Sequence, residues 1–341
     1  MKNYRIKLPQ VIILAFLCMM IVTAHFLKMD LILLLNDSLI KFMMNGILVL
    51  SLIPMLNAGI GMNFGLPIGI TSGLIGMCIA INFRLTGMTG FLGAILFTVP
   101  TGVAFGWVYG LILNKVKGRE EIAGTFLGFS FIPLMNYFWT LAPFQNRQML
   151  YPIGGAGLRP KIGLNPYFTK ILDTLFVIKI KGVSIPLGML IFYSLICVFI
   201  YTFFKSKLGR AMIAVGENEH FSYLSGINIL NARSFAIILS TTIAGVGICV
   251  YAQSYGFLEL YNSPLMMAFP AVSAILIGGS TGRKTFIFEA ILGTYVFQSI
   301  YLLSVPLANE LLVPEIAEIF RMMITNAIIL YALLKKERGV S

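Results

Sequence analysis

The stretch SIPLGMLIFYSLICVFIYTFF, residues 184–204, contains no charged side chain and is followed at once by the basic run that begins at Lys205. A helix of this length reaches about 30 Å, which is the thickness of the hydrocarbon core of a bilayer. A helix also satisfies its own backbone hydrogen bonds, as lipid requires. We therefore interpret residues 184–204 as a membrane-spanning helix that meets water at Lys205.

Similar blocks fill the chain of 341 residues, in which 58% of residues are hydrophobic and 11% are charged. A soluble domain has about 25% charged residues, so lipid is the main solvent expected here. Apolar length predicts ten spans, at residues 11–28, 43–63, 66–82, 90–113, 122–143, 184–204, 234–254, 264–281, 285–304 and 315–334. The expected fold class is an all-α membrane protein, a polytopic helical bundle that forms a single domain over residues 1–341. Because the turn Phe64–Pro67 carries no charge, residues 43–82 are also compatible with one broken, re-entrant unit.

The basic residues predict the orientation of the chain. No small-residue cleavage site follows the first apolar block, so we interpret it as a retained span rather than a signal peptide. An N-terminus inside places five basic groups, 15 of the 25 Lys and Arg residues, in the cytoplasm, as the positive-inside rule favours. The groups are Lys2, Arg5 and Lys7; Lys115, Lys117 and Arg119; Lys205, Lys207, Arg210 and Arg233; Arg283 and Lys284; and Lys335, Lys336 and Arg338. An even number of spans then leaves both termini in the cytoplasm, residues 144–183 as an external loop and residues 205–233 as a cytoplasmic loop.

Several kinds of chemistry find no support in this sequence. The net charge is +12, but the basic residues lie in short clusters between spans, which favours topology signals over nucleic-acid binding. Cys18, Cys78, Cys197 and Cys249 each stand alone in an apolar block, and the only histidines are His25 and His220. We therefore expect no metal, no disulfide and no cofactor. No paired catalytic groups lie in the spans, so we name no catalytic residue and disfavour an intramembrane enzyme.

Glycine and proline mark the spans in two ways. Gly61, Gly65, Gly69 and Gly73 recur at every fourth residue, and so do Gly102, Gly106 and Gly110. This spacing predicts strips along which helix backbones approach closely. Pro54, Pro67, Pro100, Pro133 and Pro270 interrupt spans, and broken helices commonly border a substrate path. Five spans in each half would also give the halves opposite orientations, as in an inverted repeat, although the halves show no convincing sequence identity.

The polar segment 205–233 contains the signals of one short helix. Asn218 is a good N-cap, Glu219 suits the positive end of the helix dipole, and Gly226 suits a C-terminal stop. Phe221 and Leu224 would share one face. A short capped helix with exposed apolar side chains is suited to docking into a groove on a partner. From these residues alone, a connector that lies on the membrane surface is the favoured interpretation.

The motif Gly209-Arg210-x5-Gly216-Glu217-Asn218, followed by Ser225-Gly226-Ile227-Asn228, resembles the cytoplasmic coupling loop of permeases in the ribose/branched-chain amino-acid class of bacterial ABC importers. In that family the short helix sits in a cleft of the ATPase subunit and passes its closure to the membrane spans. The resemblance implies this ATPase-coupling role for Gly209, Arg210, Gly216, Glu217, Asn218, Glu219 and Gly226. The chain departs from the family at His220-Phe221-Ser222, where small residues are usual.

The same resemblance implies the partners and the location. They are a cytoplasmic ATP-binding subunit, an external solute-binding protein, a second permease copy or paralogue, and the lipid of a bacterial inner membrane. The glycine-rich segment 277–283 is similar to the family's late cytoplasmic turn. Gly278-x4-Arg283-Lys284-Thr285 has the spacing of a phosphate loop, but Arg replaces its second glycine and no strand precedes it. ATP hydrolysis is therefore expected in another subunit, and this chain is not expected to be an enzyme.

The identity of the solute is less determined. The glycine-rich turn favours a simple sugar, whereas Glu120-Glu121-Ile122 and Tyr223-x2-Gly226 resemble the nucleoside branch, and a branched-chain amino acid stays possible within the class. Asn57, Asn63, Thr71 and Ser72 are candidates for a polar substrate path, and helix capping or helix-to-helix bonding explains them equally well. The alternative function is an ion-coupled secondary transporter. It expects buried charges, and the spans offer only Glu289, Glu318, Arg321 and His25.

Overall fold

The computed structural model of the chain describes residues 8–152, 155, 157–180, 183–280, 284–311, 319 and 323. Its helices are α1 (Leu8–Phe26), α2 (Leu31–Leu50), α3 (Ile53–Asn57), α4 (Leu66–Asn82), α5 (Gly87–Lys115), α6 (Glu120–Leu141), α7 (Ile171–Thr174), α8 (Leu187–Lys205), α9 (Lys207–Glu217), α10 (Glu219–Leu224), α11 (Ile229–Tyr255), α12 (Ser263–Ile277) and α13 (Ile287–Leu311). The strands are β1 (Lys161–Gly163), β2 (Val177–Ile180), β3 (Val183–Pro186) and β4 (Phe257–Glu259).

The apolar blocks predict the membrane helices well. Within the described residues, six helices are long and apolar enough to span a bilayer, namely Leu31–Asn57, α5, α6, α8, α11 and Ile287–Leu307. The apolar helices α1, α4 and α12 are shorter. The polytopic helical class is confirmed, but the count of ten spans is not, and the block 315–334 lies almost wholly outside the described residues.

The second span begins earlier than the apolar block indicates. The prediction starts it at residue 43, but α2 starts at Leu31 because the Asp30 side chain accepts hydrogen bonds from the backbone N–H groups of Ile32 (3.0 Å) and Leu33 (3.1 Å). A capped N-terminus of this kind supports the first helical turn. The first part of α2 carries polar residues such as Asn36, Asp37 and Lys41, so apolar length alone does not include it in a span.

The helical backbone is interrupted between α3 and α4. Residues 58–65 are not helical, and Gly59 (φ +70°) and Gly61 (φ +99°) take the left-handed backbone region that favours glycine. The spacing predicts that Gly61 belongs to a helical glycine strip. This prediction is wrong for Gly61, because it lies outside the helices. Of the prolines expected to interrupt spans, only Pro54 and Pro67 border this break, whereas Pro100, Pro133 and Pro270 lie inside continuous helices.

Gly69, Gly73, Gly102, Gly106 and Gly110 lie where α4 and α5 pack against α11, which is buried along most of its length, whereas Gly65 lies in the break against Tyr109. A Cβ on Gly69 would lie 2.7 Å from Cβ of Ala244, and one on Gly106 would lie 2.7 Å from Cα of Ile238. Gly73 meets the backbone oxygen of Gly245 in the same way. The predicted close approach of helix backbones is thus confirmed at these positions, with α11 as the shared partner.

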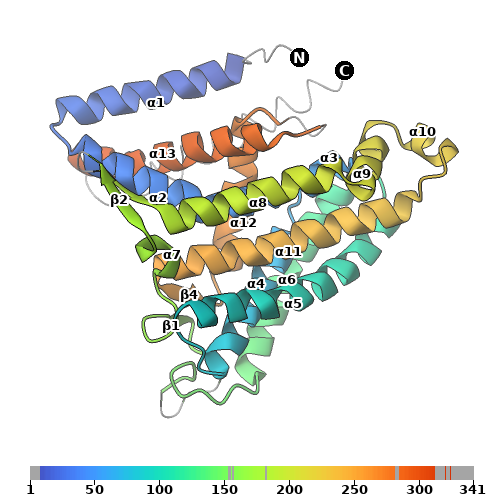
Figure 1. Cartoon of the computed structure of the whole chain (residues 1–341), viewed down its shortest axis with the longest axis horizontal. Helices are drawn as coiled ribbons and strands as arrows, with labels where there is room; N and C mark the ends of the chain where they lie inside the picture. The colour runs from blue at the N-terminus through green and yellow to red at the C-terminus, as the bar shows by residue number, and fades with distance from the viewer. Residues whose placement is uncertain are drawn as a thin grey trace.

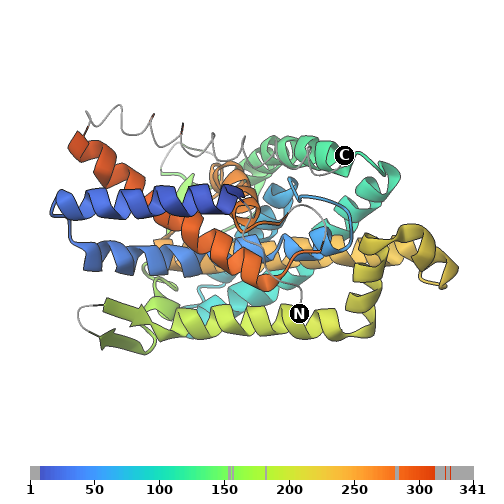
Figure 2. The same cartoon turned by 90° about the horizontal axis from the view of Figure 1, so that it is seen from above.

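The two ends of the bundle differ. Figure 1 shows α9 and α10 at one end, and α7 with the strands at the other. There β1 pairs antiparallel with β4, and β2 pairs antiparallel with β3. Figure 2, turned by 90°, keeps the β2–β3 hairpin and α10 at opposite ends. Segment 144–183 is therefore not an open loop, because buried side chains such as Leu164 and Phe168 pack it onto the helices.

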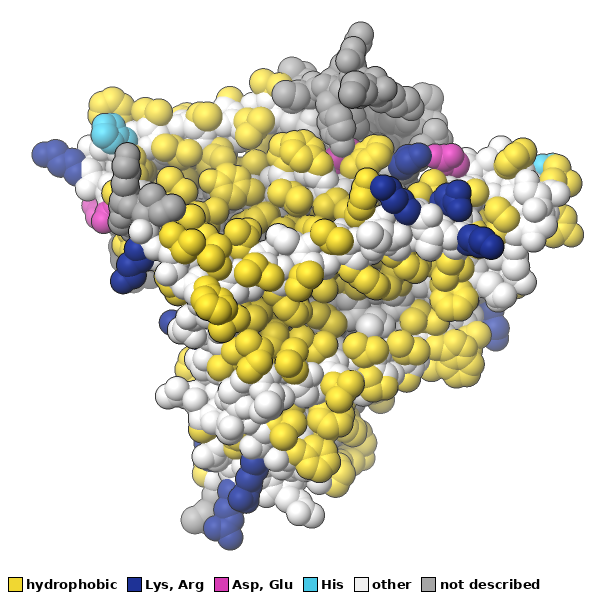
Figure 3. All heavy atoms as spheres, viewed as in Figure 1, with side chains coloured by type: hydrophobic (Ala, Val, Ile, Leu, Met, Phe, Trp, Pro, Cys, Tyr) yellow, Lys and Arg dark blue, Asp and Glu magenta, His cyan; other side chains and the backbone are white. Residues whose placement is uncertain are grey.

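Between these ends, hydrophobic side chains cover the face of the molecule seen in Figure 3, and the Lys and Arg side chains visible there lie towards its edges. Exposed apolar side chains also occur on α8, where Leu195 and Val198 are 60% and 56% exposed. An apolar belt with charged ends is the arrangement that a bilayer requires of a helical protein.

Candidate functional site

The segment that carries the predicted coupling motif folds into two helices rather than one. The first, α9, starts at Ser206, whose hydroxyl accepts a hydrogen bond from the Gly209 N–H (3.2 Å). Its buried side chains Met212 and Val215 pack in one cluster with Met55 and Ala58 of the α3 region. One face of α9 is thus part of the protein core.

Glycine is required where α9 meets the rest of the chain. A Cβ on Gly209 would lie 2.5 Å from Cα of Phe204. At the other end of α9, Gly216 lies against the backbone oxygen of Asn57. A Cβ added to Gly216 would lie 2.8 Å from the Gly59 nitrogen. The end of α9 therefore touches the first residues of the 58–65 break, backbone to backbone.

The second helix, α10, has the caps that the sequence predicts. The Asn218 side chain accepts a hydrogen bond from the Phe221 N–H (2.9 Å), and Gly226 ends the turn with a φ of +77°. Phe221, Tyr223 and Leu224 are 64%, 69% and 71% exposed. Exposed apolar side chains next to one another on six helical residues are costly in water unless a partner covers them.

Two ion pairs hold the predicted acidic residues to neighbouring segments. Lys284 Nζ lies 3.1 Å from Glu217 Oε1, and Lys117 Nζ lies 2.7 Å from Glu219 Oε2. Arg210 is exposed on α9. The sequence motif did not reveal either lysine as a partner, because both follow from how the ends of α5 and α13 lie beside α9 and α10.

A buried ion pair lies beneath this surface. The guanidinium of Arg233 on α11 pairs with the Glu120 carboxylate at the start of α6, and its Nε donates to Asn114 Oδ1 (3.2 Å). Arg233 is 4% exposed. The sequence predicts Arg233 only as one of the basic residues on the cytoplasmic side. In the structure it also joins α5, α6 and α11.

The four candidate path residues are buried but do not form one surface. Asn57 accepts from the Thr285 N–H (2.7 Å) and donates to the Thr285 oxygen (3.2 Å), while Asn63 donates to Ser240 (2.9 Å). Thr71 and Ser72 donate to backbone oxygens of their own helix. These bonds match the capping and helix-bonding interpretation, and the substrate path through the four residues stays a prediction.

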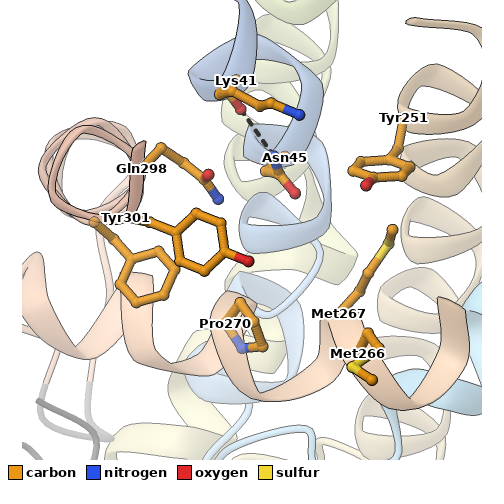
Figure 4. A pocket seen from close by; sticks show the side chains of 9 residues that line it. Lys41, Asn45, Tyr251, Met266, Met267, Pro270, Gln298 and Tyr301 are labelled. Carbon is orange, nitrogen blue, oxygen red and sulfur yellow. Dashed lines mark hydrogen bonds between the residues drawn. The ribbon is translucent and has the colours of Figure 1, made fainter. Parts of the chain in front are cut away.

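A polar pocket lies elsewhere, between α2, α11, α12 and α13. Figure 4 shows Lys41 and Asn45 on α2, Tyr251 on α11 and Gln298 on α13 around a common space, with α12 beneath them. The pocket has a volume of about 130 Å³. Its remaining lining residues are Met266, Met267, Pro270, Phe297 and Tyr301.

The pocket was missed because residues 31–42 were left outside the predicted spans. The signal was nevertheless present, since Asp37, Lys41 and Asn45 recur at every fourth residue. That spacing places them on one helix face. Gln298 gave no such signal, because a single amide in an apolar block has many explanations.

The comparisons with known proteins extend over nearly the whole chain. Residues 34–333 match a family described as branched-chain amino acid transport system / permease component. The probable ABC transporter permease protein YphD of Escherichia coli is 28% identical over 155 residues, which is 44% of each chain. The nucleoside ABC transporter permease protein NupC of Lactococcus lactis is 25% identical over 210 residues, or 60% of this chain and 63% of NupC. The alignments thus span roughly half the length of these relatives, and no solved structure matches.

Proposed function

Because the chain belongs to the family of permease components of branched-chain amino acid transport systems, we propose that it is the membrane-spanning subunit of an ATP-driven importer. In this proposal a separate ATP-binding subunit binds α9 and α10 from the cytoplasm. The chain itself supplies the passage through the bilayer. ATP hydrolysis belongs to the partner.

One observation carries this proposal. The same short segment exposes Phe221, Tyr223 and Leu224 on α10 and buries Met212 and Val215 on α9. An apolar helix face is suited to a groove on another protein, and the buried face has no freedom to move independently of the core. A displacement of α10 by a bound partner can therefore be transmitted through α9 to the core of the protein.

The route inward follows backbone contacts. Gly216 at the end of α9 touches the chain at Asn57 and Gly59, where the helical backbone stops. Across the same break, the Glu121 carboxylate accepts a hydrogen bond from the Met62 N–H (2.8 Å). A displaced α9 would thus move the 58–65 break against α6. Broken helices are where many transporters rearrange.

The solute and the other partners follow by analogy within the family. We propose a small polar solute of the sugar or nucleoside type, because one relative is named a nucleoside permease and the glycine-rich segment near Gly278 favours a sugar. An external solute-binding protein would meet the end formed by segment 144–183, and a second permease copy or paralogue would complete the passage.

The coupling proposal is tested by cross-linking in intact cells. Cysteine at Tyr223, on a background with the exposed Cys18 replaced by Ser, is reacted with a bifunctional thiol reagent. The captured protein is then identified by mass spectrometry. We expect an ATP-binding subunit of the ABC class. The matched control is Gly163→Cys, at the opposite end, which should capture no such subunit.

A matched pair of substitutions gives an independent test. Phe221 and Phe83 are both 64% exposed, but Phe83 lies next to segment 144–183, where Asn82 accepts from the Gln145 N–H (3.0 Å). Phe221→Ser should abolish ATP-dependent uptake with normal amounts of protein in the membrane, whereas Phe83→Ser should keep most of it. Normal uptake by Phe221→Ser would contradict the proposal. So would an ATP-binding subunit that is cross-linked equally by Tyr223→Cys and Gly163→Cys.

A further inference from the structure

The pocket between α2, α11, α12 and α13 places hydrogen-bonding groups inside apolar helices. Lys41 and Asn45 lie one turn apart on α2, within the candidate span Leu31–Asn57. Polar side chains at such positions are expensive and face other polar groups or water-filled cavities. Figure 4 shows Lys41 and Asn45 at the same space as Gln298 and Tyr251, which come from two other helices.

Some hydrogen-bonding groups of these side chains form no bond with the other described residues. Asn45 donates to the backbone oxygen of Lys41 (3.0 Å). Gln298 is 5% exposed, yet no other described residue forms a hydrogen bond with its side chain. No described carboxylate forms a salt bridge with Lys41, although Asp37 lies one turn earlier on α2. An amide that opens onto a pocket in this way can form hydrogen bonds with a molecule bound there.

We propose that this pocket binds the transported solute, as a deepening of the proposed transport function, and that Lys41 selects solutes that present an acceptor atom. A lysine ammonium has three donors and no acceptor, whereas Asn45 and Gln298 offer both. No Asp or Glu lines the pocket within the described residues. The site therefore accepts neutral or anionic solutes and repels cations.

The remaining lining residues indicate the shape of the solute. Phe297, Tyr251 and Tyr301 present aromatic rings, and Met266 and Met267 present flexible thioethers. Flat rings stack well on such faces. A volume of about 130 Å³ is close to that of an engineered cavity of about 150 Å³ that holds benzene. The pocket thus takes one ring, either a monosaccharide or the base of a nucleoside.

The charge preference is measured without knowing the solute. Asn45→Cys, on a background with Cys18 and Cys197 replaced by Ser, is reacted with two methanethiosulfonates of similar size, one ending in sulfonate and one in trimethylammonium. Rates are divided by those of free cysteine. We expect the sulfonate to be favoured about tenfold, the factor that one charge interaction of about 1.4 kcal/mol supplies. Lys41→Gln should remove the preference and Lys41→Arg should keep it.

Two probes then distinguish the kinds of ring. Ribose and uridine are each added during labelling of Asn45→Cys, and protection by ribose indicates a sugar site, protection by uridine alone a nucleobase site. Either result supports the pocket as the solute site. Protection by neither, or a normalised rate that is equal for both reagents or unchanged in Lys41→Gln, overturns the proposal.

The folding of each variant is checked by its melting temperature in detergent. If Lys41→Gln melts well below the parent, the same comparison is made with Gln298→Glu, whose negative charge offsets that of Lys41 and should abolish the preference for the sulfonate. No step of this labelling depends on α10 or on ATP. A failure here therefore leaves the coupling proposal standing, and a failure of cross-linking at Tyr223 leaves this pocket standing.

Discussion

Gly216 shows how one residue decides whether α9 can rest on the break in the membrane helices. Any side chain there would meet the Asn57 oxygen and the backbone of Gly59, and both are backbone atoms that cannot turn aside. The glycine of the coupling motif is therefore a packing requirement in this chain, whatever its role in contact with a partner.

Gly216→Ala should lower the free energy of unfolding by about 1–3 kcal/mol, the usual cost of forcing extra atoms into a packed contact. Thermal unfolding of the purified protein measures it. Gly163→Ala is the matched control, because nothing lies within 4 Å of its added Cβ. A Gly216→Ala protein that melts with the parent would contradict this assignment of the contact.

The Arg233–Glu120 pair is the other residue-scale feature with a large expected effect. Both side chains are at most 10% exposed, whereas Lys117 and Glu219 are 55% and 33% exposed. Removing one member of a buried pair leaves an uncompensated charge, and this costs more than losing a pair in water.

Arg233→Met should destabilise the protein by about 3–5 kcal/mol, and the double change with Glu120→Leu should recover most of that loss. Lys117→Met, which breaks the exposed pair, should cost about 1 kcal/mol or less. Chemical or thermal unfolding of the four proteins measures the series. Equal losses in Arg233→Met and Lys117→Met would show that the buried pair has no special weight.

At the scale of elements, α9 and α10 have different supports. The core holds α9 through Met212 and Val215, whereas α10 is supported by its caps, by Ser222, whose hydroxyl donates to the Asn218 oxygen (2.9 Å), and by the exposed Lys117–Glu219 ion pair. A helix of six residues has little stability of its own. The cap at Asn218 is therefore decisive for presenting Phe221 and Leu224 in one orientation.

Asn218→Ala should cost α10 about 1 kcal/mol, the usual value of an N-cap. Hydrogen exchange of residues 219–224 should become faster, while that of α12 stays unchanged, and ATP-dependent uptake should fall. Asn218→Ser keeps an acceptor oxygen and should restore both. Unaltered exchange in Asn218→Ala would mean that some other contact orders the helix.

For the whole molecule, the difference between the two ends has a direct consequence for orientation. The proposed assignment places α10 in the cytoplasm and the β1–β4 end outside, and Figure 1 shows that these two regions lie at opposite ends of the bundle. The termini themselves lie outside the described residues.

Gly163→Cys should react with a membrane-impermeant maleimide in intact cells, whereas Tyr223→Cys should react only in inside-out vesicles. The background again lacks the exposed Cys18. The reverse labelling pattern would invert the assigned orientation without changing the fold. Labelling of both positions from one side would contradict the arrangement of the ends.

Much of this molecule could be predicted without its structure. The apolar blocks located α1, α4, α5, α6, α8, α11 and α12 to within about five residues at each end, because lipid forces each block into a helix. Asn218 and Gly226 were identified as caps because capping depends on neighbours in the chain. The expected inverted repeat stays a prediction.

The misses share a physical cause. The partner of Arg233 and the pocket around Lys41 depend on which residues distant in the chain come together. Asn57 and Thr285 are bonded across 228 residues, and no local pattern contains that information. Pro100 and Pro270 likewise look like breaks in the sequence, but their helices continue through them.

By itself, then, the sequence determined that the chain folds in lipid, where most of its helices lie and how α10 is capped, since these depend on local hydrophobicity and short-range hydrogen bonds. Only the tertiary structure decided that α9 touches the 58–65 break and that Lys41, Asn45 and Gln298 face one space. Contacts of that kind follow from how helices pack against one another, and packing is settled by the whole chain at once.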